Sequence, residues 1–160
     1  MTTKEFLKLA YKIDKEIKLR KSIAQKHKDS LYGKSIDYSA IGSGGGVKDA
    51  LGRAIENVSD YENETEKLIA IHMDLRFNIE RAINALNSDK QREVLIDRYL
   101  LYMPWTSKYD KDNGKLICEG IKEKTGYSEE SIYKFHSAGL KKISVPENFT
   151  VKYSEIQKFL

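Results

Sequence analysis

Residues 126–143, GYSEESIYKFHSAGLKKI, combine a tight turn with a short helix. Gly126 suits the left-handed position that ends a helix, and Ser128 is a typical N-cap for the helix that follows it. Apolar residues recur at helical spacing along one side of residues 129–143. Gly139 costs about 1 kcal/mol relative to alanine inside a helix, so close contact with a neighbouring helix is expected to compensate for it. The stretch therefore predicts two helices joined by a tight turn, the second packed closely against another helix.

Two helices are predicted before this turn. Residues 89–102 show helical spacing of apolar side chains up to Pro104, which stops the helix. The Asp-Asn-Gly sequence at 112–114 is a strong turn signal, and residues 116–125 are predicted to form another short helix. Helix 89–102 is the expected neighbour of Gly139. These helices predict a three-helix unit that ends in a helix-turn-helix.

Residues 48–87 carry apolar side chains every seven residues, which is the heptad pattern of a coiled coil. Residues 4–31 carry a helical apolar stripe that Arg20 interrupts. The glycine-rich stretch 33–47 joins the two helices, and it lacks the Gly-Lys-Ser/Thr ending of a phosphate-binding loop. Helix 48–87 could fold back on helix 4–31, pair with another subunit, or do both. The residues expected to pair, here called the seam, are Leu51, Val58, Tyr61, Thr65, Leu68, His72, Leu75 and Ile79.

Two of the seam residues, Thr65 and His72, are polar. Polar residues at such positions commonly fix the register or the oligomeric state of a coiled coil at a cost in stability. His72 has no second metal-binding side chain at a suitable spacing, so a structural role is expected for it.

The fold class expected from these patterns is all-α. A long helical hairpin or coiled coil at residues 1–87 is expected to support oligomerisation. The helix-turn-helix unit at residues 88–143 follows it. Residues 144–160 form a C-terminal tail that is too apolar to remain free, so it is expected to pack on this unit or on a partner.

The composition excludes several classes of protein. Of the 160 residues, 28 are Lys or Arg and 24 are Asp or Glu, and the net charge of +4 allows a nucleic-acid partner without requiring one. The single cysteine, Cys118, rules out an internal disulfide and a cysteine-based zinc site. The three histidines lie in separate helical contexts, and no carboxylate pair, nucleophile elbow or phosphate loop stands out. We therefore expect neither an enzyme nor a bound metal or cofactor.

The apolar runs are too short to cross a membrane, and the first residues lack the apolar core of a signal peptide. A soluble cytoplasmic protein without a membrane partner is expected.

Helix 129–143 is interpreted as a DNA-reading helix. The N-terminal part of the second helix of a helix-turn-helix enters the major groove, and residues 131–143 carry three lysines and no carboxylate. Glu129 and Glu130 either interact with the positive end of the helix dipole or accept hydrogen bonds from cytosine. His136 is expected to be a core or boundary residue. The residues expected to contact DNA are Ser128, Glu129, Glu130, Ser131, Tyr133, Lys134, Ser137, Lys141 and Lys142.

Residues 88–143 resemble the fourth conserved region of bacterial sigma factors. Gln-Arg-Glu-Val at 91–94 and Arg-Tyr at 98–99 match the first helix of that region. The pattern Tyr-x-Phe-His-x-x-Gly-Leu-Lys at 133–141 is similar to that of the RinA- and ArpU-type late transcription regulators of phages that infect Gram-positive bacteria. The turn and the recognition helix are matched by Gly126, Tyr127, Ser128, Ile132, Tyr133, Phe135, His136, Leu140 and Lys141.

The resemblance implies a sequence-specific DNA-binding protein that activates late phage genes in the cytoplasm of the bacterial host. Double-stranded DNA is its implied partner, with host RNA polymerase as a possible second one, and a homo-oligomer is expected from the heptads. Two features depart from the family. The link at 103–115 is expanded, and Trp105 stands upstream of the helix that such a tryptophan usually opens.

Two other functions fit the same pattern. A phage terminase small subunit also joins a helix-turn-helix to helical oligomerisation segments and recognises DNA for packaging. A protein that binds RNA polymerase or a sigma factor could use the coiled coil and the apolar tail, with the helix-turn-helix serving only a structural role.

Overall fold

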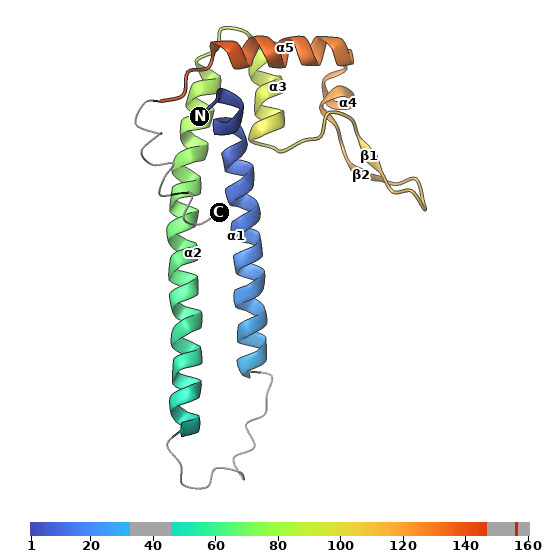
Figure 1. Cartoon of the computed structure of the whole chain (residues 1–160). Coiled ribbons are helices and arrows are strands. Elements are labelled where there is room, and N and C mark those ends of the chain that lie inside the picture. The colour runs from blue at the N-terminus through green and yellow to red at the C-terminus, as the bar shows by residue number, and fades with distance from the viewer. Residues whose placement is uncertain (33–45, 147–155, 157–160) are drawn as a thin grey trace.

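The structure is a computed structural model that describes residues 1–32, 46–146 and 156, and most of these residues are helical (Figure 1). The prediction of a mainly helical protein is therefore confirmed. None of the helices in the described ranges is long and apolar enough to span a membrane. The elements follow one another as α1 (Thr3–Tyr32), α2 (Gly46–Asn84), α3 (Asp89–Tyr99), β1 (Lys108–Tyr109), β2 (Leu116–Cys118), α4 (Ile121–Thr125) and α5 (Glu129–Lys142).

α1 and α2 lie side by side, run in opposite directions and form a long arm (Figure 1). α3, α4 and α5 gather at the end of the arm where α1 begins and α2 ends, and α5 lies across this end. Residues 3–19 and 65–84 are called the proximal part of the arm, and residues 21–31 and 52–63 its distal part. The glycine-rich connection expected at 33–47 lies outside the described residues as far as residue 45.

The proximal part of the arm contains a closely packed apolar core, because the heptad stripe of α2 meets the apolar stripe of α1. Leu95 and Tyr99 of α3, and Ile143 after α5, belong to the same core. A shared core therefore crosses the domain boundary that the sequence predicts after residue 87. The side chains of the arm that have no exposed surface in this core are Phe6, Leu7, Ala10, Ile13, Leu68, Leu75, Ile79 and Ile83.

α3 ends at Tyr99, three residues before the predicted end, and the chain after it is anchored to the arm. Tyr102 adopts a φ of 57°, a left-handed conformation that costs a residue with a side chain about 1–2 kcal/mol. Its ring lies 5.1 Å from that of Tyr11, and its hydroxyl lies 3.4 Å from Nε2 of His72. These contacts with both helices of the arm hold Tyr102 in the strained conformation.

A β-hairpin stands where the sequence predicted the first half of a helix at 116–125. The turn predicted at 112–114 is confirmed as the turn of this hairpin, with a φ of 68° at Gly114. The helix prediction is wrong for residues 116–118 because this apolar run pairs with β1 instead, and α4 begins only at Ile121. The antiparallel register places Lys108 opposite Cys118 and Tyr109 opposite Leu116.

The base of the hairpin is fixed to α4. A Cβ atom on Gly120 would lie 2.2 Å from the carbonyl carbon of Thr106, so only glycine allows the segments just before β1 and just after β2 to approach this closely. The Ser107 amide and hydroxyl both donate to a carboxylate oxygen of Glu123, at 2.8 and 2.9 Å. The hairpin therefore projects from the start of α4 as a fixed extension.

The C-terminal tail contributes one described residue to the core. Ile156 is buried in the proximal core, and Val145 is partly buried against the same core. Residues 147–155 and 157–160 lie outside the described residues.

Candidate nucleic-acid interface

The turn between α4 and α5 has the local geometry that the sequence predicts. Gly126 ends α4 in a left-handed conformation with a φ of 70°, and its amide donates to the carbonyl of Lys122 at 2.9 Å. The hydroxyl of Ser128 accepts from the amide of Ser131 at 3.2 Å and so caps α5. Both local predictions, the glycine C-cap and the serine N-cap, are confirmed.

One face of α5 is fixed by close contact with α3. Ile132, His136 and Gly139 are buried on this face. A Cβ atom on Gly139 would lie 2.7 Å from Cδ1 of Leu95, which is itself fully buried in α3. The prediction that Gly139 permits close packing on helix 89–102 is confirmed.

Trp105 supports α5 from the segment that precedes the hairpin. Its ring centroid lies 5.4 Å from that of Tyr133 and 5.0 Å from that of His136. The guanidinium of Arg98 lies 4.6 Å from the Trp105 ring, within the range of a cation–π interaction. The backbone of this segment is held as well, since the amide of Lys122 donates to the carbonyl of Trp105 at 3.1 Å. Trp105, whose position differs from that of the tryptophan in the regulators that the sequence resembles, therefore packs beneath α5.

His136 is neutral at physiological pH. Burial, and secondarily the positive charges of Lys4 and Arg98, lower its pKa from 6.5 to about 4. Nε2 of His136 and the hydroxyl of Tyr99 share a hydrogen bond of 3.0 Å. His136 is thus a buried, neutral histidine that joins α5 to α3. The positive charge on the exposed face of α5 therefore comes from its lysines.

The opposite face of α5 is exposed to solvent and carries several of the residues that the sequence predicts to contact DNA. Lys134, Ser137 and Lys141 are spaced three and four residues apart, so they form one stripe along the helix. Tyr133 is 44% exposed beside this stripe, with its ring supported by Trp105. The other predicted residues that are exposed are Ser128, Glu129, Glu130 and Lys142.

Two of the predicted contact residues are already engaged with each other. The hydroxyl of Ser128 lies 2.8 Å from that of Ser131 and also caps the helix. Ser131 is half-buried rather than exposed. Their hydroxyls therefore order the first turn of α5, and the exposed side chains beyond them are better placed to meet a ligand.

Packing brings a further cation beside α5 that sequence spacing does not reveal. Nζ of Lys90 in α3 lies 5.8 Å from the ring of Tyr127 and 5.7 Å from that of Phe135. Lys124 of α4, in contrast, forms an ion pair of 2.5 Å with Asp97, whose side chain is almost fully buried. Lys90 therefore adds positive charge at the edge of the α5 face, whereas Lys124 is committed to the contact between α3 and α4.

The predicted seam is used inside the chain. Thr65, Leu68, His72, Leu75 and Ile79 are all buried where α2 faces α1. Val58 and Tyr61 are half-buried in the distal part, and the side chain of Leu51 lies outside the described residues. Burial inside one chain leaves the five buried residues no surface to offer a second subunit in this arrangement.

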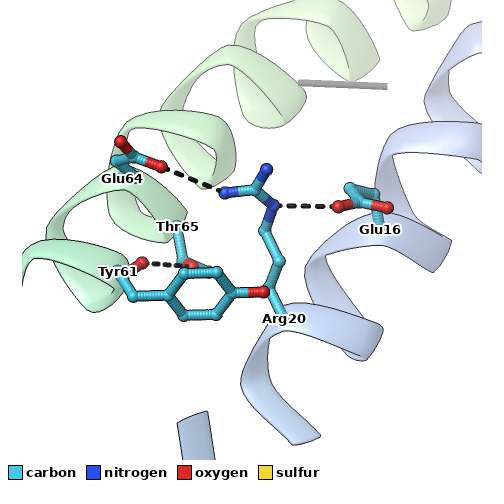
Figure 2. Close-up of polar contacts among 5 residues, drawn as sticks. All are labelled: Glu16, Arg20, Tyr61, Glu64 and Thr65. Carbon is cyan, nitrogen blue, oxygen red and sulfur yellow. Dashed lines mark hydrogen bonds and ion pairs between the residues drawn. The ribbon is translucent and has the colours of Figure 1, made fainter. Parts of the chain in front are cut away.

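A polar layer separates the two parts of the arm (Figure 2). Nε of Arg20 lies 2.9 Å from Glu16 on the same helix, and its Nη1 lies 3.4 Å from Glu64 on α2. The hydroxyl of Thr65 donates to the carbonyl of Tyr61 at 2.8 Å. Arg20, which interrupts the apolar stripe of α1, thus forms a polar link to α2 in place of an apolar contact.

The part of the chain that the structure describes contains no group of His, Cys, Asp or Glu side chains that could hold a metal ion. Cys118 is exposed on β2. Comparison with protein-family models, with curated protein sequences and with solved structures gives no match for the chain.

Proposed function

We propose that the protein is a sequence-specific regulator of transcription that binds duplex DNA, with α4, the turn at Gly126 and α5 acting as a helix-turn-helix. The observation that carries this proposal is the exposed stripe of Lys134, Ser137 and Lys141. This stripe lies opposite a face of α5 that α3 holds in place. A reading helix needs both properties, because base contacts require an exposed polar face and a fixed orientation.

In this proposal the first half of α5 enters the major groove. Tyr133 and Lys134 then meet base edges, and Lys141 and Lys142 meet phosphates near the other end of the helix. Lys90 adds a phosphate contact from α3. Ser128 acts chiefly as the helix cap, whereas Glu129 and Glu130 keep the two roles that the sequence leaves open.

The biological setting follows from the resemblance to phage late-gene regulators. The protein is proposed to activate late genes in the cytoplasm of a bacterial host, as a binding protein without catalytic activity or cofactor. Activation in this setting brings host RNA polymerase close to the bound protein.

The test begins with selection of binding sequences from a random duplex library. Fluorescence anisotropy then compares a selected duplex with a scrambled one at two salt concentrations. Selective, salt-sensitive binding is expected, and each lost phosphate contact should lower the salt slope by about 0.9. Failure to enrich any sequence would overturn the proposal.

Three variants locate the interface. Lys134→Ala should weaken binding to the selected duplex about tenfold or more, within the range of about 1–3 kcal/mol for a base contact. Tyr133→Phe removes only the hydroxyl and keeps the ring that packs on Trp105, so a loss of selectivity would assign base reading to that hydroxyl. Lys67→Ala, an exposed lysine on the arm, is the matched control and should leave binding unchanged.

A second candidate function, binding to a protein such as RNA polymerase, is favoured by the hairpin of β1 and β2. Tyr109, Leu116 and Ile117 are exposed large apolar side chains on this hairpin. Exposed apolar groups of this kind suit a protein partner better than phosphates. Equal weak binding to both duplexes, unaffected by Lys134→Ala, would favour this alternative.

A further inference from the structure

The distal part of the arm has an open apolar groove between its two helices. The groove has a volume of about 380 Å³. Ile23 and Leu31 of α1 face Val58 and Tyr61 of α2 across it, and all four side chains are only half-buried. Ala24 is the one described side chain of the distal part that is buried. Two helices alone thus leave the apolar stripe incompletely covered here.

The helices on either side of this groove carry opposite charges. Residues 17–28 of α1 contain five Lys or Arg and no carboxylate, whereas residues 54–66 of α2 contain five Asp or Glu and no Lys or Arg. The two stretches lie next to each other, since Lys28 and Glu62 form an ion pair of 2.7 Å between the helices. One edge of the distal arm is therefore basic and the other acidic.

Exposed side chains of α1 and α2 border the groove on both sides. Leu19 and Lys26 stand four residues before and three residues after Ile23, so they lie on its side of α1. Leu19 is 55% exposed, and Lys26 is exposed as well. Asp60, also exposed, stands three residues after Asn57, which lines the groove from α2. An apolar centre is thus flanked by a cation on one side and a carboxylate on the other.

We infer that a second copy of this chain covers the groove and that the distal part of the arm is a homodimer interface. A two-fold interface brings the same patch of both subunits together, so its charges must be self-complementary. The basic edge of α1 and the acidic edge of α2 meet this requirement, because each copy offers both. The interface includes the half-buried seam residues Val58 and Tyr61 but none of the five seam residues that are buried within the chain. It does not depend on DNA binding.

Sedimentation equilibrium of the full chain without DNA tests this inference. The expected mass is twice 18.4 kDa at micromolar concentrations. Lys26→Glu or Asp60→Lys alone places like charges together and should weaken dimerisation about tenfold or more. The double variant Lys26→Glu/Asp60→Lys exchanges the charges within each chain and should restore most of the lost affinity. Both positions are exposed, so circular dichroism should show an unchanged helix content.

Apolar contact is tested by a matched pair of substitutions. Leu19, the last residue of the proximal part on α1, adjoins the groove, so Leu19→Glu should disrupt the dimer. Met73→Glu changes an exposed apolar residue of α2 that lies farther from the groove, and it should not disrupt the dimer. A monomer at all concentrations would overturn the inference, and so would a dimer that tolerates Leu19→Glu and both single charge reversals. Since no DNA is present, either result leaves the proposed DNA-binding function to be judged separately.

Discussion

The proximal and distal parts of the arm continue the same apolar stripes, yet they are buried to different extents. Leu75 and Ile79 have no exposed surface in the proximal part, whereas Val58 and Tyr61 remain half-buried in the distal part. The difference lies in a third layer. α3, Ile143 and Ile156 cover the proximal part, and no element in the described ranges covers the distal part. Two helices bury only the stripe of side chains along which they touch. A closed core needs a third element that covers the side of the helix pair.

The largest expected contrast comes from the same substitution in both parts. Leu75→Ala should lower the free energy of unfolding by about 2–5 kcal/mol, because it opens a cavity in a closed core. Leu31→Ala should cost less than about 1 kcal/mol, because the groove around Leu31 already contains open space. Urea unfolding at a protein concentration too low for dimerisation measures both values. Equal costs would show that the distal part is closed in solution.

A smaller expected effect is the loss of unfolding free energy at acidic pH, which we assign to His136 beside the proximal part of the arm. His136 has a pKa of about 4 in the folded protein and 6.5 as its ordinary value, so only the unfolded chain takes up its proton as the pH falls between these values. The free energy of unfolding should therefore fall from pH 6.5 to pH 4 by up to about 3 kcal/mol on account of this residue. Urea unfolding followed by the fluorescence of Trp105, which contacts His136, measures this loss.

The variant His136→Gln serves as the control for that titration. Glutamine can keep a hydrogen bond to Tyr99 but does not titrate, so the acid slope should become shallower. His72, whose pKa is lowered mainly by burial, contributes in the same direction and remains in the variant. An identical slope in both proteins would assign the acid sensitivity to other groups.

The smallest expected effect belongs to the polar layer between the two parts. Arg20→Met should change the free energy of unfolding by less than about 1 kcal/mol, because Glu16 and Glu64 keep contact with water and neither becomes a buried unpaired charge. A double-mutant cycle with Glu64→Gln measures the coupling between the two side chains. A coupling well above 1 kcal/mol would mean that the layer stabilises the arm rather than merely interrupting its core.

Local rules predict the region around α5 well. A left-handed glycine, a serine cap and a glycine at a helix contact each depend on backbone geometry within a few residues, and Gly126, Ser128 and Gly139 show all three. The support that Trp105 gives to α5 could not be predicted in this way. It comes from a segment more than twenty residues away, and only the folded chain brings the rings together.

The hairpin shows where sequence periodicity is insufficient. Residues 116–118 are a run of three apolar or weakly polar residues, too short to separate a strand from a helix. Their partner strand has two residues, so it shows no pattern of periodicity either.

The partner of the seam of α2 is a second feature that the sequence does not determine. Heptads predict that a helix is covered along one side, but they do not distinguish the chain's own α1 from a second subunit.

If the chain binds DNA as proposed, the length of the arm has a consequence for the layout of its targets. α1 has 30 residues and therefore spans about 45 Å, and α5 lies across the end of the arm opposite the proposed dimer interface. If the arms of the two subunits lie parallel, both α5 helices are at the same end of the dimer and can meet one duplex. Arms that join in opposite directions would turn the two helices away from each other, so that one dimer would tether two separate duplexes or close a loop between distant sites. The arm would then act as a rigid spacer that sets how far apart two DNA segments are held.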